Sequence, residues 1–141
     1  MNKAAGAGKQ HTARCSCGGL SVTVAGDPVR VNACTCLNCQ RRSGSAFTYT
    51  AFFPDDAVVA ITGESRVWRE VRDAGRWHDS MFCPVCGMMV YSRLEAIPNT
   101  IGLAVGCIGD PAFAAPETFY WTLRRPHWLV LPEDIRALDR Q

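Results

Sequence analysis

The sequence predicts a small, mainly β domain of several short antiparallel strands with few short helices, stabilised by zinc. Short runs of alternating apolar and polar residues recur along the chain, separated by turn signals rich in Gly, Pro and Asp. Seven of the eight cysteines fall into tight clusters, which is typical of metal ligands. With 141 residues, 48% of them hydrophobic, the chain fits one domain that buries a core without disulfides.

The first residues of the chain differ from the rest. Met1 to Arg14 is rich in Ala, Gly, Lys and Gln and contains no apolar run, which disfavours a signal peptide or a membrane anchor. We expect residues 1–12 to form a flexible tail and residues 13–141 to form a single zinc-binding domain. No apolar run reaches membrane-spanning length. Clustered cysteines without a secretory signal indicate a reducing compartment, so we expect a cytoplasmic protein.

Two strands are predicted between the first and second cysteine clusters. Leu20 to Val24 alternates apolar and hydroxyl residues with a period of two, which predicts a half-buried strand. Gly26-Asp27-Pro28 predicts a turn, and Val29 to Ala33 is expected to return as a second strand that ends at Cys34. The sequence therefore predicts a hairpin with cysteines at both open ends.

The remaining elements are mostly strands. Gln40 to Gly44 is expected to form one helical turn or a tight loop. Pro132 to Leu138 is expected to form a short helix, because proline suits the first helical position and acidic residues suit the first turn. Strands are predicted at residues 46–53, 58–62, 65–71, 77–82, 88–92, 100–105 and 118–123.

Three thiols lie within six residues in the segment Cys34-Thr35-Cys36-Leu37-Asn38-Cys39. At these spacings one metal ion is able to bind all three. Zinc prefers four tetrahedral ligands, and a catalytic site leaves one of the four positions for water or substrate. Because no fourth ligand is obvious nearby in the sequence, we expect Cys34, Cys36 and Cys39 to form an open, catalytic zinc site.

The other paired cysteines predict a structural zinc site. Cys83-Pro84-Val85-Cys86-Gly87 is typical of a zinc knuckle, which supplies two ligands. Cys15 and Cys17 are candidates for the other two, because residues two apart on a strand point to the same face. Spacing alone also permits Cys15 and Cys17 to join the central cluster. Cys107 is either a small buried hydrophobe or a fourth ligand that closes the central site.

Three cysteine motifs follow one another in a specific order: Cys15-x-Cys17-Gly18-Gly19, then Cys34-x-Cys36-x-x-Cys39 followed by Arg41-Arg42-Ser43-Gly44, then Phe82-Cys83-x-x-Cys86-Gly87. In this order they resemble the glutathione-dependent formaldehyde-activating enzyme family, which includes centromere protein V. The resemblance spans roughly residues 13 to 131. It implies a β-tent-like fold with two zinc ions per chain, a structural one on Cys15, Cys17, Cys83 and Cys86 and a catalytic one on Cys34, Cys36 and Cys39.

The resemblance also implies an activity. The reaction named for the family joins formaldehyde to glutathione as S-(hydroxymethyl)glutathione, or reverses that step, and is classed as that of a carbon-sulfur lyase. It implies a zinc-dependent lyase that acts on an adduct of a small-molecule thiol such as glutathione. Family members often carry histidine between the cysteines of both Cys-x-Cys motifs, whereas this chain has Ser16 and Thr35.

Several residues near the central cluster are candidates for substrate binding or proton transfer. Arg41 and Arg42 follow the cluster and suit a carboxylate, although they fit equally well as solvated surface arginines. Tyr49 is expected to point toward the cluster from its strand. His78 and His127 are candidate proton shuttles. We expect three tryptophans to lie in the core or in the wall of a pocket: Trp77, Trp121 and Trp128.

Two functions are compatible with the sequence. In the first, the protein is the lyase described above; in the second, both zinc sites are closed and the domain is a non-catalytic binding module. The formal charge is +2. Seven thiolates on two zinc ions contribute −7 + 4 = −3, so the metal-loaded protein carries about −1. A near-neutral chain without a long basic run disfavours nucleic-acid binding, and we therefore favour the lyase. The sequence gives no indication of the oligomeric state.

Overall fold

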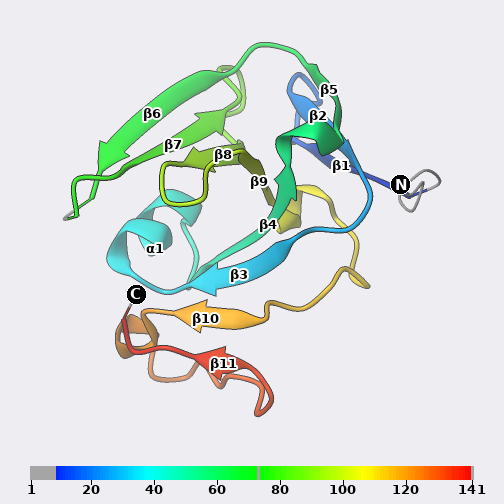
Figure 1. Ribbon diagram of the computed structural model, residues 1–141. Helices are drawn as coiled ribbons and strands as arrows, with labels where there is room; N and C mark the ends of the chain where they lie inside the picture. Colours follow the sequence, from blue (N-terminus) through cyan, green and yellow to red (C-terminus); the bar gives the residue numbers. More distant parts are fainter. Residues whose placement is uncertain (1–8, 73, 141) are drawn as a thin grey trace.

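The computed structural model describes residues 9–72 and 74–140 and confirms a mainly β fold. Figure 1 shows strands that belong to two sheets, with one short helix, α1 (Leu37–Ser43), beside the larger sheet. The smaller sheet has the order β1-β2-β5, formed by β1 (Gln10–Arg14), β2 (Ser21–Ala25) and β5 (Val58–Thr62). No helix among the described residues is long and apolar enough to cross a membrane.

The larger sheet has eight strands in the order β11-β10-β3-β4-β9-β8-β7-β6. Their bounds are β11 (Arg136–Ala137), β10 (Thr118–Tyr120), β3 (Arg30–Cys34), β4 (Thr48–Pro54), β9 (Thr100–Ala104), β8 (Met89–Leu94), β7 (Trp77–Phe82) and β6 (Arg66–Val71). Three short 3₁₀ turns join strands: η2 (Asp55–Ala57), η3 (Val105–Cys107) and η4 (Thr122–Arg124). The sheet curves around α1, so that β6 and the segment after β10 both reach the helix (Figure 1).

The core lies between the two sheets. Ala13 of β1 and Val22 and Val24 of β2 are fully buried and point inward, as expected for strands with a period of two. They pack against inward residues of the larger sheet. Each fully buried aliphatic or aromatic side chain contributes about 1.5–3 kcal/mol by leaving water. The fully buried members of this core include Ala13, Leu20, Val22, Val24, Phe53, Val90, Ile101 and Leu103.

The helix α1 begins inside the central cysteine cluster. Cys36 is its N-cap residue, and its sulfur accepts a hydrogen bond from the backbone N–H of Cys39 at 3.4 Å. Gly44 ends the helix with a φ of 61°, a left-handed conformation that glycine adopts without strain. The helical turn expected from Gln40 to Gly44 is therefore present, but it starts earlier, at Leu37.

The expected tail boundary is wrong for residues 10–12, because these residues belong to β1. The strand pairs with β2 along its whole length in an antiparallel register. The hydroxyl groups of Thr12 and Thr23 lie 2.9 Å apart across this pair, and Ala13 is fully buried. Pairing with β2 thus orders a segment whose own composition gives little sign of structure. Residues 1–8 lie outside the described residues.

The expected hairpin between residues 20–24 and 29–33 is also wrong. The two strands exist as β2 and β3, but they belong to different sheets. The backbone N–H of Gly26 bonds the carbonyl of Lys9, just before β1, whereas the N–H of Val29 bonds the carbonyl of Phe52 in β4. The Gly26-Asp27-Pro28 segment therefore carries the chain from one sheet to the other, which separates the first cysteine pair from the central cluster.

The end of the chain differs from the sequence prediction as well. Part of the segment 132–138 forms β11 instead of a helix, because the N–H groups of Arg136 and Leu138 bond the carbonyls of Glu117 and Phe119. β10 pairs in parallel with both β11 and β3, so the larger sheet is not wholly antiparallel. The strands predicted at 58–62 and 77–82 have the predicted bounds.

A variant at Gly63 tests the contact between the smaller sheet and the first cysteine motif. The φ of Gly63 is 94°, and a Cβ atom there would overlap the carbonyl oxygen of Gly19. We expect Gly63→Ala to lower the free energy of unfolding of the metal-loaded protein by at least about 2 kcal/mol, measured by urea denaturation. Gly109→Ala is the matched control, because Gly109 also has a positive φ but has open space around its Cβ position. Equal losses in the two variants would contradict this contact.

Candidate metal centres and the adjoining cleft

Four cysteine sulfurs converge where the β1–β2 turn meets the β7–β8 turn. The first turn supplies Cys15 and Cys17, and the second supplies Cys83 and Cys86. The sulfurs of Cys15 and Cys17 lie 3.7 Å apart, and those of Cys17 and Cys83 lie 3.6 Å apart. Four sulfurs placed tetrahedrally at about 2.3 Å from one zinc ion would lie about 3.8 Å from each other. The geometry and the sulfur donors therefore fit zinc.

Backbone N–H groups surround these sulfurs. The Cys15 sulfur accepts from Leu20 at 3.2 Å, and the Cys83 sulfur accepts from Val85 at 3.4 Å. The pKa of Cys86 is lowered to about 6, mainly because of a backbone hydrogen bond at Met88. Hydrogen bonds of this kind stabilise thiolates, which are the form that binds metal. These hydrogen bonds favour ionised Cys86. A backbone hydrogen bond at Gly19 lowers the pKa of Cys17, but the sulfurs of Cys83 and Cys15 outweigh it and raise that pKa to about 11, so a bound cation is needed to ionise all four cysteines.

The second group contains Cys34, Cys36 and Cys39, whose sulfurs all lie within 4.8 Å of one another. Cys34 ends β3, Cys36 caps α1 and Cys39 lies in its first turn, so one strand-to-helix junction supplies all three. No fourth Cys, His, Asp or Glu in residues 9–72 and 74–140 joins this group within that distance. Three soft sulfur donors fit zinc and leave one of its four positions to another ligand.

The three thiols of this group are strongly coupled. Hydrogen bonds from Cys34 and Cys36, together with the charge of Arg42, hold the pKa of Cys39 far below its usual range. The same contacts with Cys36 and Cys39 raise the pKa of Cys34. The site thus favours a thiolate on Cys39, while a bound cation is needed to ionise Cys34.

The structure shows where the remaining cysteines lie relative to the two groups of thiols. Cys15 and Cys17 lie with the knuckle pair and not with the central group. The Cys107 sulfur contacts the carbonyl oxygen of Met89 at 3.5 Å. Burial raises the pKa of Cys107, and the charges of Cys15 and Cys86 raise it further. Cys107 therefore lies beside the four-cysteine group, and it does not close the central group.

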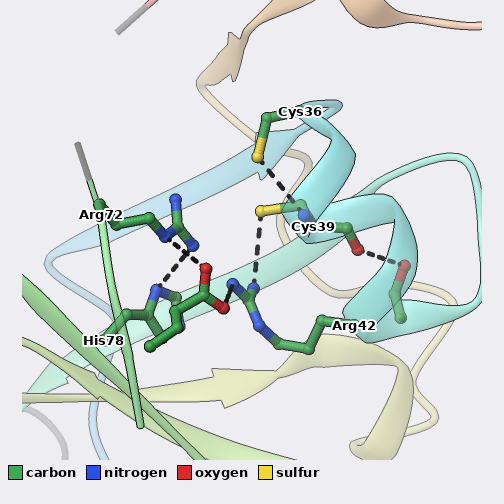
Figure 2. A network of polar contacts seen from close by, with 7 residues as sticks. Cys36, Cys39, Arg42, Arg72 and His78 are labelled. Atoms are coloured by element: carbon green, nitrogen blue, oxygen red, sulfur yellow. Dashed lines mark hydrogen bonds and ion pairs between the residues drawn. The ribbon is translucent and has the colours of Figure 1, made fainter.

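A network of buried ionic contacts adjoins the central cysteines, as Figure 2 shows. Arg42 donates to the sulfur of Cys39 at 3.5 Å and lies 3.4 Å from one oxygen of Glu70. The Nε atom of Arg72 lies 2.9 Å from the other oxygen of Glu70. Because Glu70 carries one negative charge against two guanidinium groups, one positive charge remains to balance the sulfurs.

His78 completes this network as a neutral side chain. A terminal nitrogen of Arg72 lies 3.1 Å from its Nδ1. Since a guanidinium only donates hydrogen bonds, Nδ1 must accept, and the ring proton is on Nε2. Burial, and then the charges of Arg42 and Arg72, lower the pKa of His78 to about 3. At neutral pH the ring can therefore donate a hydrogen bond through Nε2 but is a poor proton acceptor.

A cleft of about 450 Å³ opens beside the central cysteines. Cys36 connects it to the metal-binding group, and Trp77 and Trp121 contribute aromatic surface, as expected of pocket-wall tryptophans. The cleft is also lined by His78 and by three arginines. The full set of lining residues is Cys36, Leu37, Asn38, Val71, Arg72, Ala74, Arg76, Trp77, His78, Leu94, Ala96, Trp121 and Arg124.

The predicted substrate-binding residues do not line this cleft. Arg41 is exposed on α1, and Arg42 lies against Cys39 and Glu70. The hydroxyl group of Tyr49 donates to the carbonyl of Ala114 at 2.5 Å, on the side of β4 opposite the cysteines. His127 is exposed and is also absent from the described lining. The strand period accounts for Tyr49, because its neighbour Thr48 is the β4 residue that faces Cys39.

The structure defines the molecule as a mainly β, cysteine-rich protein with two groups of thiols arranged for metal binding. The profile of the glutathione-dependent formaldehyde-activating enzyme family matches residues 10–124. The chain belongs to this family, which confirms the resemblance carried by its cysteine motifs.

Two individual proteins illustrate the relationship. A Fusarium vanettenii protein, provisionally named a glutathione-dependent formaldehyde-activating enzyme, is 26% identical over 82 residues, which are 58% of this chain and 43% of that protein. This chain thus matches less than half the length of that relative. The crystal structure of a Rhodobacter sphaeroides protein is similar in fold, with a TM-score of 0.56 and 17% identity, over 71% of this chain and 91% of that chain.

The partition of the cysteines can be tested by metal content. We expect Cys83→Ser to lose one of two zinc ions per chain, because Cys83 is a buried member of the four-cysteine group. Cys107→Ser should keep both ions, since Cys107 is outside both groups. Mass spectrometry of the metal in the purified variants measures this. Loss of an ion from Cys107→Ser would show that the described groups do not account for the ligands.

The protonation of His78 can be tested by nuclear magnetic resonance. The ¹⁵N shifts of its ring should report a neutral Nε2–H tautomer and no titration between pH 8 and pH 5, because the folded-state pKa lies near 3. The unfolded chain takes up a proton below about pH 6.5 and the folded chain does not. Because of this difference at His78, the free energy of unfolding decreases as the pH falls from about 6.5 toward 3. A ring that titrates near pH 6 would contradict the buried network.

Proposed function

We propose that the protein is a zinc-dependent carbon-sulfur lyase that interconverts formaldehyde plus glutathione with S-(hydroxymethyl)glutathione. The observation that carries this proposal is a group of three thiols without a fourth described protein ligand, in contact with a cleft through Cys36. A closed structural site would instead have four protein ligands, as the other cysteine group has. Membership in the formaldehyde-activating family supports the same activity.

The proposed reaction adds a thiol across a carbonyl group. The sulfur–carbon bond forms, the carbonyl π bond opens, and the thiol proton ends on the new hydroxyl oxygen; the lyase direction reverses each change. Zinc on Cys34, Cys36 and Cys39 would hold the substrate sulfur as a thiolate, a role that suits a metal already bound by three electron-rich sulfurs. A second zinc ion on Cys15, Cys17, Cys83 and Cys86 would serve the fold.

The side chains of this protein have separate tasks in the proposal. Arg42 and Arg72 provide positive charge near the sulfurs, which favours ionised thiols over neutral ones. The neutral ring of His78 orients Arg72 through Nδ1. We place the catalytic centre at Cys34, Cys36 and Cys39, and we expect glutathione to enter through the cleft of about 450 Å³. Action on cytoplasmic glutathione agrees with the free thiols that the site requires.

The open metal position can be tested with the cobalt-substituted protein. Glutathione should increase the sulfur-to-cobalt charge-transfer absorption in the near ultraviolet, with saturation, because a fourth thiolate joins the metal. The same titration of Cys36→Ser should lack this rise or show it with weaker affinity.

Catalysis is measured with the zinc-loaded forms of the same proteins, as the rate of exchange between glutathione and its formaldehyde adduct, by two-dimensional exchange spectroscopy. The zinc-loaded protein should accelerate this exchange, and Cys36→Ser should not. A wild-type protein that shows neither added absorption nor faster exchange would instead be a binding module stabilised by closed zinc sites.

A further inference from the structure

The cleft has more positive charge than the described part of the protein neutralises. Three arginines line it, whereas no carboxylate among residues 9–72 and 74–140 does. Arg72 is paired with Glu70 at 2.9 Å. Arg76 and Arg124 form no ion pair with any described carboxylate. These two guanidinium groups therefore remain available for an anionic ligand.

The charges near the metal centre divide the arginines into an inner pair, Arg42 and Arg72, and an outer pair, Arg76 and Arg124. Three thiolates and one zinc ion have a net charge of −3 + 2 = −1. Arg42 and Arg72 with Glu70 have a net charge of +2 − 1 = +1, and Arg42 contacts Cys39 directly. The inner groups thus balance one another. The two positive charges of Arg76 and Arg124 are in excess, and they can pair with two carboxylate groups of a ligand.

Hydrogen bonds to the backbone carbonyls of Arg76 and Arg124 hold the two segments that carry these outer arginines. The N–H of Arg72 bonds the carbonyl of Arg76 and closes the turn between β6 and β7. On η4, the carbonyl of Arg124 accepts from the side chain of Gln40 at 3.0 Å. Gln40 lies in α1, directly after Cys39, and also donates to the carbonyl of Thr35 at 2.8 Å. A shift of η4 would therefore break its hydrogen bond with the cysteine segment.

Trp121 adds an independent sign that this part of the cleft is built for a ligand. It has a φ of 59°, in the left-handed region that bulky residues rarely adopt. The hydroxyl group of Thr35 holds the carbonyl of Trp121 at 2.5 Å and contacts that of Tyr120 at 3.2 Å. Strained backbone that the surrounding structure maintains is concentrated at ligand-binding sites. Here the strain places an indole in the lining of the cleft, next in the chain to the 3₁₀ turn that holds Arg124.

We propose that Arg76 and Arg124 select the substrate by binding two carboxylate groups of the thiol, while Trp77 and Trp121 contact its apolar part. This inference rests on the proposed function and names the class of thiol that the site accepts, a dicarboxylate. The arginines predicted from the sequence, Arg41 and Arg42, have no part in this selection. Neutral thiols of similar size bind more weakly because they leave both guanidinium groups without a partner.

The test measures affinity by calorimetry with the zinc-loaded protein. Glutathione is compared with its diethyl ester, which keeps the thiol and lacks both carboxylates. Arg76→Met and Arg124→Met remove each charge while keeping an unbranched side chain, and Arg125→Met is the matched control because Arg125 neighbours Arg124 outside the cleft lining. We expect each cleft variant to raise the Kd for glutathione about tenfold, the ester to bind the wild type about tenfold more weakly or worse, and Arg125→Met to change neither.

The cobalt titration separates a failure of this inference from a failure of the proposed function. If glutathione raises the cobalt absorption but the ester binds as tightly as glutathione, carboxylate selection is overturned and the lyase proposal stands. The thioether S-methylglutathione keeps both carboxylates and has no free thiol. If no thiol changes the cobalt absorption while S-methylglutathione still binds through Arg76 and Arg124, the lyase proposal fails and carboxylate binding stands.

Discussion

The convergence of four sulfurs from two distant turns is the constraint on which the rest of the structure depends. Cys17 and Cys83 are 66 residues apart in the chain, yet their sulfurs lie 3.6 Å apart. A metal ion bound there closes a long loop, and the free-energy cost of closure grows only slowly with loop length. The loop contains β2 to β7 and α1, so it includes the central cysteines and the cleft-lining residues from Cys36 to His78. A metal ion at this site would thereby fix the frame in which the central cysteines are held.

The central site combines local and distant contributions. One strand-to-helix junction supplies its three sulfurs, so their spacing follows largely from local backbone structure. Its charge balance instead depends on Glu70 and Arg72, which β6 and the turn after it bring to α1 (Figure 2). In the proposed function, this arrangement leaves the excess positive charge of the cleft to the substrate, so that substrate binding and charge balance at the metal would use different arginines.

How well the sequence predicts a feature depends on how far apart along the chain the interacting residues lie. The strands at 58–62 and 77–82 follow from the turn signals that flank them, and short spacers predict which cysteines form each motif, whereas spacing alone left open which group Cys15 and Cys17 join. Strand pairing is not local, and the expected β2–β3 hairpin failed because Val29 pairs with β4. The same limit applies to the cleft. Arg76 and Arg124 come from segments far along the chain from the central cysteines, whereas the sequence pointed to Arg41 because it is adjacent to them.

The central claim is that one metal position is open to a substrate thiol. Zinc K-edge X-ray absorption of the fully loaded protein measures it by counting sulfur ligands. A four-sulfur site and a three-sulfur site average about 3.5 sulfurs per zinc, and glutathione should raise the average to about 4. An average of 4 before any thiol is added, or one that stays near 3.5 at saturating glutathione, would contradict the claim.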